Sequence, residues 1–270
     1  MRIHRVVIIT VAMLVANFAQ GESPPGEIPF KLAQGFGIVV RGGIGPLTNL
    51  NFLVDTGAVP SVLSERVASR IGFTGVPGSF ALLNKNVQAQ YVTVDEVRLG
   101  PIRALYQSMA VVDLARFERL LGTRIDAIVG LDILARQSLS IDYKHGKITL
   151  GLSGLARHVL PVEIYALSGA PYWILPITLG GHSFRVLLDT GANELALFAG
   201  HIPNLDGEEA AARPLPLFMG GVAVDKTLAV VLDEPPSAFQ NIDGVLGPAA
   251  LRMSRVEFDL EHKCLRWDTE

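Results

Sequence analysis

Two aspartates stand in the same unusual setting in the two halves of this sequence. Asp55 and Asp189 each follow a run of mostly apolar residues, and each is followed at once by Thr-Gly-Ala. The apolar run predicts a buried strand, and a carboxyl group buried there is costly unless it is hydrogen-bonded or paired. The glycine lets the chain turn sharply and brings backbone N–H groups close to the carboxylate. The pattern therefore favours carboxylate chemistry.

Two such carboxyl groups in contact would form an acid–base pair. They cannot both ionise easily, so the pair holds one shared proton over a range of pH. The ionised member can take a proton from water, and the protonated member can donate to a substrate carbonyl oxygen. The sequence thus predicts Asp55 and Asp189 as a catalytic pair that directs water onto an amide bond, without a covalent intermediate, a metal or a cofactor.

The Asp-Thr-Gly motif is the first of three landmarks that occur twice in the same order. Each copy is followed by an apolar segment that ends in a glycine, Gly130 in the first half and Gly247 in the second. Each half then has an aspartate in an apolar strand, Asp142 or Asp259, before a charged turn and a last strand. This repetition predicts two homologous halves. A pseudo-twofold arrangement of the halves would bring the two motifs face to face.

The elements that must position these motifs are mainly strands. The alternation of apolar residues and the turn residues between them predict strands at 37–40, 50–54, 90–94, 148–150, 173–179, 184–188, 222–224 and 228–232. Two short helices are predicted in the first half, at 64–71 and 113–122. The expected fold is all-β with a few short helices, in two pseudo-twofold-related β-barrel-like lobes at 35–155 and 156–270. Trp173 and Trp267 are expected in the core.

The first 21 residues have the layout of a secretory signal peptide. Arg2 and Arg5 precede an apolar run at 6–16, and small residues at Ala19 and Gly21 fit a cleavage site. The run is shorter than the ~20 residues that span a membrane. We expect cleavage and export to the periplasm or beyond, with no stable membrane span afterwards, and a flexible linker at 22–34. An uncleaved membrane anchor is the alternative.

The composition excludes several classes of function. The net charge is −3 with no basic block, so nucleic acid is not an expected partner. Cys264 is the single cysteine, which rules out an intramolecular disulfide and predicts a buried thiol. No His-Glu-x-x-His motif, Gly-x-Ser-x-Gly motif or phosphate-binding loop occurs. Neither a metal nor a cofactor is therefore expected.

With its paired Asp-Thr-Gly-Ala motifs and the two downstream glycines, the chain resembles retropepsin-like aspartic proteases, of the bacterial single-chain type with two tandem halves. The resemblance implies that Asp55 and Asp189 are catalytic and that their neighbours support the active site. Thr56 and Thr190 would brace the two loops against each other. The other implied support residues are Gly57, Ala58, Gly191, Ala192, Gly130 and Gly247, of which the last two would lie below the loops.

The sequence also departs from the viral pattern of this family. Val59 and Asn193 stand where the viral enzymes usually have Asp, and Leu131 and Pro248 stand where they have Arg or Asn. A stabilising ion pair is therefore not expected at these positions. Hairpins at 80–91 and 215–224, which turn near 84–86 and at Gly220-Gly221, are the candidates for flaps that close over a substrate. Ordinary surface hairpins are the alternative interpretation.

The leading hypothesis is an aspartic endopeptidase that acts on peptides or unfolded proteins. The alternative is a catalytically inactive peptide-binding module with the same fold, which the departures from the viral pattern suggest. Retention of both Asp-Thr-Gly triplets favours the enzyme, because binding alone does not need two buried acids. A monomer with an internal pseudo-dimer is expected, and pairing of chains through exposed strand edges is the other possibility.

Overall fold

The structure, a computed structural model, describes residues 26–82, 85–167, 170–202, 213–233, 235 and 239–269. The predicted signal peptide at 1–21 lies outside the described residues. The predicted linker at 22–34 is wrong over its second part, because Glu27–Ala33 form strand β1, which pairs with two other strands. Within the described ranges, no helix is long and apolar enough to cross a membrane.

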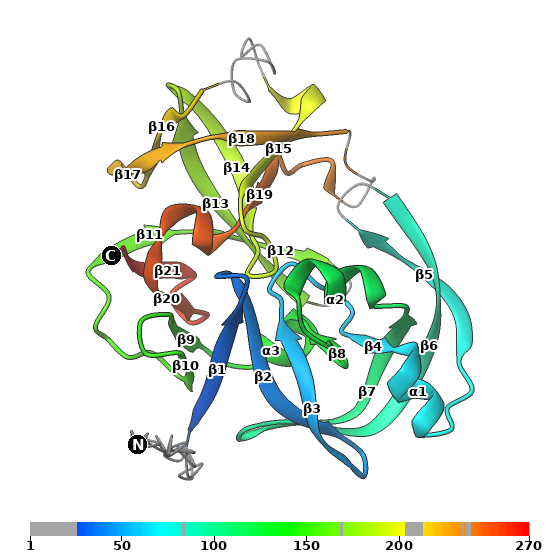
Figure 1. The fold of residues 1–270 in the computed structure, drawn as a ribbon. Coiled ribbons are helices and arrows are strands. Elements are labelled where there is room, and N and C mark those ends of the chain that lie inside the picture. Colours follow the sequence, from blue (N-terminus) through cyan, green and yellow to red (C-terminus); the bar gives the residue numbers. More distant parts are fainter. Residues whose placement is uncertain are drawn as a thin grey trace, which may run out of the picture.

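The chain forms two lobes with a sheet between them (Figure 1). The elements of the first half are β1 (Glu27–Ala33), β2 (Gly37–Ile44), β3 (Leu47–Val54), β4 (Val62–Ser64), α1 (Glu65–Arg70), β5 (Val76–Leu82), β6 (Lys85–Leu99), β7 (Ile102–Val112), α2 (Ala115–Leu121), β8 (Ala127–Val129), α3 (Leu131–Leu134), β9 (Leu139–Asp142) and β10 (Lys147–Leu150).

The elements of the second half are β11 (His158–Pro161), β12 (Glu163–Leu167), β13 (Ala170–Leu179), β14 (His182–Leu188), β15 (Leu195–Phe198), η1 (Ala199–His201), β16 (Leu215–Met219), β17 (Val222–Thr227), β18 (Ala229–Leu232), β19 (Gly244–Leu246), η3 (Pro248–Leu251), β20 (Met253–Asp259) and β21 (Cys264–Thr269). The prediction of a mainly β fold with barrel-like sheets and a few short helices is confirmed.

A sheet built by both halves joins the lobes. Its strands run in the order β11-β21-β20-β9-β10-β1, so strands of the second half lie directly beside strands of the first. The junction is antiparallel, with Val256 opposite Ile141 and Phe258 opposite Leu139. The sheet continues through β2 and β3 into the first lobe, while an eight-stranded sheet forms the second lobe. The lobes are therefore tied by backbone hydrogen bonds.

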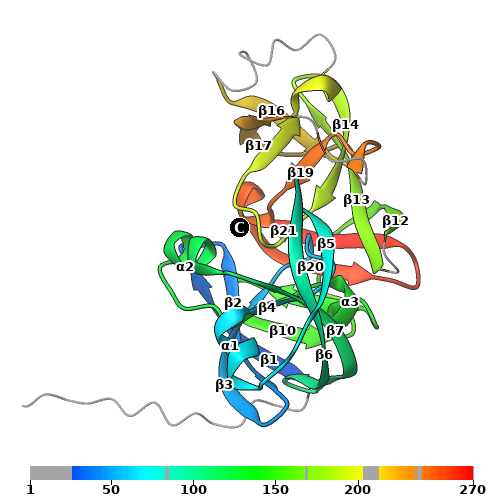
Figure 2. The same cartoon turned by 90° about the vertical axis from the view of Figure 1, so that its right-hand side faces the viewer.

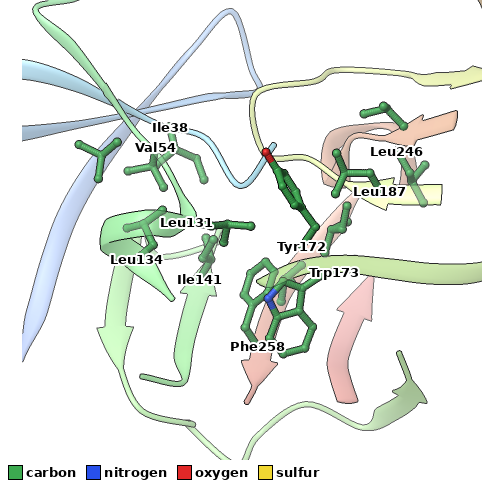
Figure 3. Packing of buried hydrophobic residues seen from close by; sticks show 14 of the residues in the cluster. Ile38, Val54, Leu131, Leu134, Ile141, Tyr172, Trp173, Leu187, Leu246 and Phe258 are labelled. Atoms are coloured by element: carbon green, nitrogen blue, oxygen red, sulfur yellow. The ribbon is translucent and has the colours of Figure 1, made fainter. Parts of the chain in front are cut away.

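The hydrophobic core is continuous across the two lobes. Figure 3 shows Tyr172, Trp173 and Phe258 between Ile141 and other residues of the first half and Leu187 of the second. The Trp173 and Phe258 rings meet edge to face, with centroids 5.2 Å apart. Trp173 and Phe258 are both buried, as is Trp267, so the core prediction for both tryptophans is confirmed. Burial of such large side chains fixes the lobes relative to each other.

The two predicted helices are present. The Ser64 hydroxyl caps α1 by accepting the N–H of Val67 at 3.3 Å. Helix α2 begins at Ala115, later than predicted, and the Asp113 carboxylate accepts the Ala115 N–H at 2.9 Å. Gly122 ends α2 with a φ of 63°, which favours glycine. Helix α3 was not predicted, because four residues carry too little periodicity for a helical pattern.

The repeat seen in the sequence is also a repeat of topology. Strand β3 pairs in parallel with β8, and β14 pairs in parallel with β19, with Val54 opposite Val129 and Leu188 opposite Leu246. Strand β4 likewise runs parallel to β7, and β15 runs parallel to β18. Each half therefore delivers its aspartate from the end of the same kind of central strand.

Candidate active site

Asp55 and Asp189 each stand one residue beyond a buried strand, at the start of a tight loop. The Asp55 N–H donates to the carbonyl of Val129 at 3.0 Å, and the Asp189 N–H donates to the carbonyl of Leu246 at the same distance. Each backbone is therefore fixed by the strand beside it, β8 in the first half and β19 in the second. The two loops approach each other from opposite lobes.

Thr56 and Thr190 hold the loops together. The Thr56 N–H donates to Thr190 Oγ1, and the Thr190 N–H donates to Thr56 Oγ1, both at 3.0 Å. Each hydroxyl then donates to a carbonyl of the other half, at 2.9 Å to Leu188 and at 2.9 Å to Val54. Both threonines are buried, so water does not compete for these four bonds. The structure thus places these residues as the predicted brace.

The brace brings the two carboxyl groups into contact, and they share a hydrogen bond. The Gly57 N–H donates to Asp55 Oδ1 at 2.9 Å, and the Gly191 N–H donates to Asp189 Oδ1 at 2.7 Å. A Cβ on Gly57 would lie 2.5 Å from Asp189 Cγ, and one on Gly191 would lie 2.6 Å from Asp55 Oδ2. Only glycine therefore leaves room for the aspartate of the other half.

Burial and mutual repulsion set the protonation of this pair. Burial raises the pKa of Asp55 well above its usual value, and the Asp189 charge raises it further. Burial also raises the pKa of Asp189. The pKa of the Tyr172 hydroxyl is raised by burial and then by Asp55, Asp189 and Asp132. The pair therefore keeps a shared proton to a higher pH than a lone aspartate would.

Gly130 and Gly247 lie directly against the two loops that the resemblance implies they support. A Cβ on Gly130 would lie 2.1 Å from the carbonyl oxygen of Ala58, and one on Gly247 would lie 2.2 Å from that of Ala192. The backbone of each loop therefore rests directly on the glycine. This completes a symmetric frame in which the same residue types take the same places in both halves.

Comparison with known proteins agrees with this geometry. Residues 39–133 match a family model described as aspartyl protease. Among solved structures, the aspartic proteinase from Irpex lacteus matches with a TM-score of 0.56 and 16% identity, over 90% of this chain and 97% of that one. The chain has the aspartic protease fold of the pepsin and retropepsin type. No curated protein sequence matches the chain significantly.

In the first half, a hydrogen-bonded cluster lies close in sequence to Val59 and Leu131, the two positions where the viral pattern would have an ion pair. Asp132 accepts the Ser61 N–H at 3.0 Å and the Ser61 hydroxyl at 2.6 Å. The side-chain amide of Gln107 also donates to Asp132, at 2.8 Å. The sequence analysis missed these residues. One feature of the sequence could have pointed to them: Asp132 stands two residues after Gly130, whereas Ala249 stands two residues after Gly247.

Both predicted hairpins are present. Strands β5 and β6 pair from Val76–Tyr91 to Leu82–Lys85, and their turn at 83–84 lies outside the described residues. Strands β16 and β17 turn at Gly220-Gly221, where φ values of 55° and 80° favour glycine. Figure 2 shows the β5–β6 hairpin extending from the first lobe alongside the second. That either hairpin closes over a substrate stays a prediction.

The described part of the chain contains no group of three or more His, Cys, Asp or Glu side chains placed to hold a metal ion. Cys264 is buried, as predicted. The polar groups of the two aspartate loops that meet at the junction of the lobes are carboxyl, hydroxyl and backbone N–H groups. Such a set can transfer protons and orient a water molecule.

Proposed function

We propose that this protein is an aspartic endopeptidase that hydrolyses peptide bonds, with Asp55 and Asp189 as one catalytic pair. The observation that carries the proposal is the hydrogen-bonded contact of the two carboxyl groups, whose pKa values are both raised. Two acids held this way destabilise the folded protein at neutral pH, and a role in proton transfer accounts for their retention. The family match supports peptides as the substrates.

The proposed reaction begins with a water molecule bound between the two carboxyl groups. The ionised carboxylate takes a proton from this water as its oxygen attacks the carbonyl carbon, and the protonated carboxyl donates its proton to the carbonyl oxygen. A neutral tetrahedral diol results, and the pair again holds one proton. That proton passes to the amide nitrogen, the C–N bond breaks, and a hydroxyl proton of the diol returns to the pair. The Gly57 and Gly191 N–H groups hold the carboxyl groups in place throughout.

The surroundings of the pair support an extended substrate. A hollow of about 440 Å³ opens beside the second loop, lined by Asn193, Glu194, Leu195 and residues of β18 and η3. It is large enough for a substrate side chain. The β5–β6 and β16–β17 hairpins are the proposed flaps, one from each lobe. The signal-peptide-like leader supports the further proposal that the enzyme is exported to the periplasm or outside the cell. We also propose that it works as a monomer, because one chain supplies both Asp-Thr-Gly motifs.

The test is cleavage of an acid-denatured protein between pH 2 and pH 8, with the sites identified by mass spectrometry. We expect the most rapid cleavage at acid pH, because the pair must keep one proton. Asp55→Asn and Asp189→Asn should each lose about 10²–10⁴-fold or more of the activity, the usual contribution of acid–base catalysis. Binding of peptides without cleavage at any pH would instead favour the inactive peptide-binding module.

A further inference from the structure

The loop that carries Asp55 ends at a buried serine held by one carboxylate. Asp132 accepts two hydrogen bonds from Ser61, from the N–H at 3.0 Å and from the hydroxyl at 2.6 Å. The Ser61 oxygen in turn accepts the N–H of Gly130 at 2.9 Å. Ser61 is fully buried, so water does not replace these bonds. Asp132 therefore fixes both the backbone and the side chain of Ser61.

These contacts lead back to the proposed catalytic pair. Gly130 lies against the carbonyl of Ala58 so closely that a Cβ would be 2.1 Å from its oxygen. The Leu131 N–H donates to the same carbonyl at 3.1 Å. The Ala58 N–H donates to the backbone carbonyl of Asp55 at 3.3 Å, which closes the turn that presents the Asp55 carboxyl group. A continuous series of contacts thus joins Asp132 to Asp55 without direct contact between the two carboxyl groups.

Asp132 is itself oriented from outside the loop. The Gln107 amide donates to Asp132 Oδ2 at 2.8 Å, and the Arg136 guanidinium donates to Gln107 Oε1 at 3.1 Å. Three donors therefore point at one carboxylate, two from Ser61 and one from Gln107. An acceptor held by this many donors has one preferred orientation, and it transmits that orientation to the residues it binds.

The second loop has no such carboxylate. The residues that correspond to Ser61, Gln107 and Asp132 are Leu195, Thr227 and Ala249. There the Gly247 N–H donates to the backbone carbonyl of Glu194 at 3.0 Å. Pro248 has no N–H to give to the carbonyl of Ala192. Any effect of Asp132 should therefore fall on the Asp55 side of the pair.

We propose that Asp132 is a positioning residue for Asp55, and that it acts through Ser61 to hold the Asp55 loop in the orientation that faces Asp189. The inference rests on the proposed function, because it assigns a role in the same reaction. The contacts that link Asp132 to the pair run through Ser61, Gly130 and Ala58.

The experiment measures kcat, KM and the pH profile of the full chain on one peptide chosen from the cleavage digest. Asp132→Asn keeps the shape of the side chain but cannot accept from both Ser61 donors, and Ser61→Ala removes the hydroxyl. Each should lower kcat by about 10–100-fold, the cost of a small misplacement of a reacting group, with KM nearly unchanged. The upper limb of the kcat–pH profile should move to lower pH, because a looser pair shares its proton less well.

Two comparisons separate positioning from a general loss of structure. The double variant Asp132→Asn/Ser61→Ala should have about the same kcat as the less active of the two single variants, because both changes break the same contact. Asp95→Asn makes the same chemical change at an exposed residue of β6 and should leave kcat and its pH profile unchanged. Thermal melts at the assay pH confirm that each variant is folded at the assay temperature.

The proposal is overturned if folded Asp132→Asn keeps kcat within about twofold of the wild type with an unshifted pH limb, since misplacement alone should cost more. A loss confined to KM, or failure of both Asp132→Asn and Ser61→Ala to fold, would also contradict it. If the wild type cleaves and Asp55→Asn does not, these outcomes remove only the positioning role. If the wild type cleaves nothing, the proposed function fails and takes the positioning role with it.

Discussion

The loops at Asp55 and Asp189 are alike where they meet and unlike where they are anchored. At the interface, each threonine makes the same two bonds across the pseudo-twofold axis, and each glycine leaves the same space for the opposite carboxyl group. Farther out, the first loop is held by a carboxylate and a serine, whereas among the described residues the Gly247 N–H anchors the second loop by donating to the backbone carbonyl of Glu194. The shared chemistry constrains only the atoms at the axis, and each lobe reaches that geometry by its own means.

The difference in anchoring also changes the space beside each loop. In the first lobe, Ser61, Gln107 and Asp132 fill the position next to the loop with a hydrogen-bonded cluster. In the second lobe, the hollow of about 440 Å³ takes the corresponding place. The pseudo-twofold frame thus has a different structure beside each of its two loops. The following changes test how far the symmetry extends.

The largest effect is expected from the glycines at the axis. Gly57→Ala and Gly191→Ala each place a methyl group within contact distance of the opposite carboxyl group and should force the pair apart. We expect each variant to lose at least about 100-fold in kcat/KM, and to similar extents, because a shift of ~1 Å has this cost. Steady-state cleavage of one peptide by both variants measures the effect. Unequal losses, with one variant near wild-type activity, would show that the symmetry fails at the axis.

A smaller effect, on stability, is expected from the brace. Thr56→Val and Thr190→Val keep the shape of the side chain but leave a buried N–H and a buried carbonyl without a partner. Each should lower the free energy of unfolding by about 2–4 kcal/mol, and the two should agree closely. Urea denaturation monitored by tryptophan fluorescence provides the measurement. Thr56→Ser and Thr190→Ser, which keep the hydroxyl, are the controls, and valine variants as stable as these would contradict the brace.

The smallest expected effect is the loss of folding stability that the two buried carboxyl groups cause as the pH rises. The pKa of Asp55 is raised in the folded protein, mainly by burial and then by Asp189. The contribution of Asp55 to the stability of the fold is therefore fully present below the pKa of Asp in the unfolded chain, about 3.9. It is lost as the pH rises through the raised pKa of the folded protein. Because asparagine does not titrate, Asp55→Asn should gain stability over the wild type as the pH rises.

Thermal melts at pH 3 and pH 7 measure this gain. The Tm of Asp55→Asn minus the Tm of the wild type should be about 2–4 °C larger at pH 7 than at pH 3. A change of ~1 kcal/mol in stability shifts the Tm by this amount in a protein of this size. Asp189→Asn should behave in the same way, because its pKa is raised by burial as well. A difference in Tm that is equal at the two pH values would argue against the raised pKa values.

The symmetric part of the site could be predicted from the sequence because its residues are adjacent in the chain. The motif Asp-Thr-Gly-Ala occurs at 55–58 and again at 189–192, so the repeat can be recognised directly. Gly130 follows the first copy, and Gly247 follows the second. The central strands β3 and β14 were predicted for a similar reason, since their apolar runs are continuous. Twofold repetition then predicted the contact between the halves without any knowledge of the tertiary structure.

The asymmetric part was missed because it depends on contacts between residues far apart in the sequence. Ser61, Gln107 and Asp132 come from three separate segments, and each is an ordinary polar residue in its own local sequence. The sequence of strand β1 predicts a linker because one proline and two charged residues interrupt its apolar pattern, and pairing on both sides outweighs that weak propensity. Strand β7 was missed in the same way, since its pairing with β6 decides its conformation.

The most direct test of the account is whether Asp55 and Asp189 act as one unit. We would measure kcat/KM for Asp55→Asn, Asp189→Asn and the double variant on the same peptide at the optimal acid pH. If the two carboxyl groups share one proton and one water, each single variant loses about as much activity as the double variant. If either single variant keeps wild-type activity, or if the two losses simply add in the double variant, the two aspartates do not form a catalytic pair.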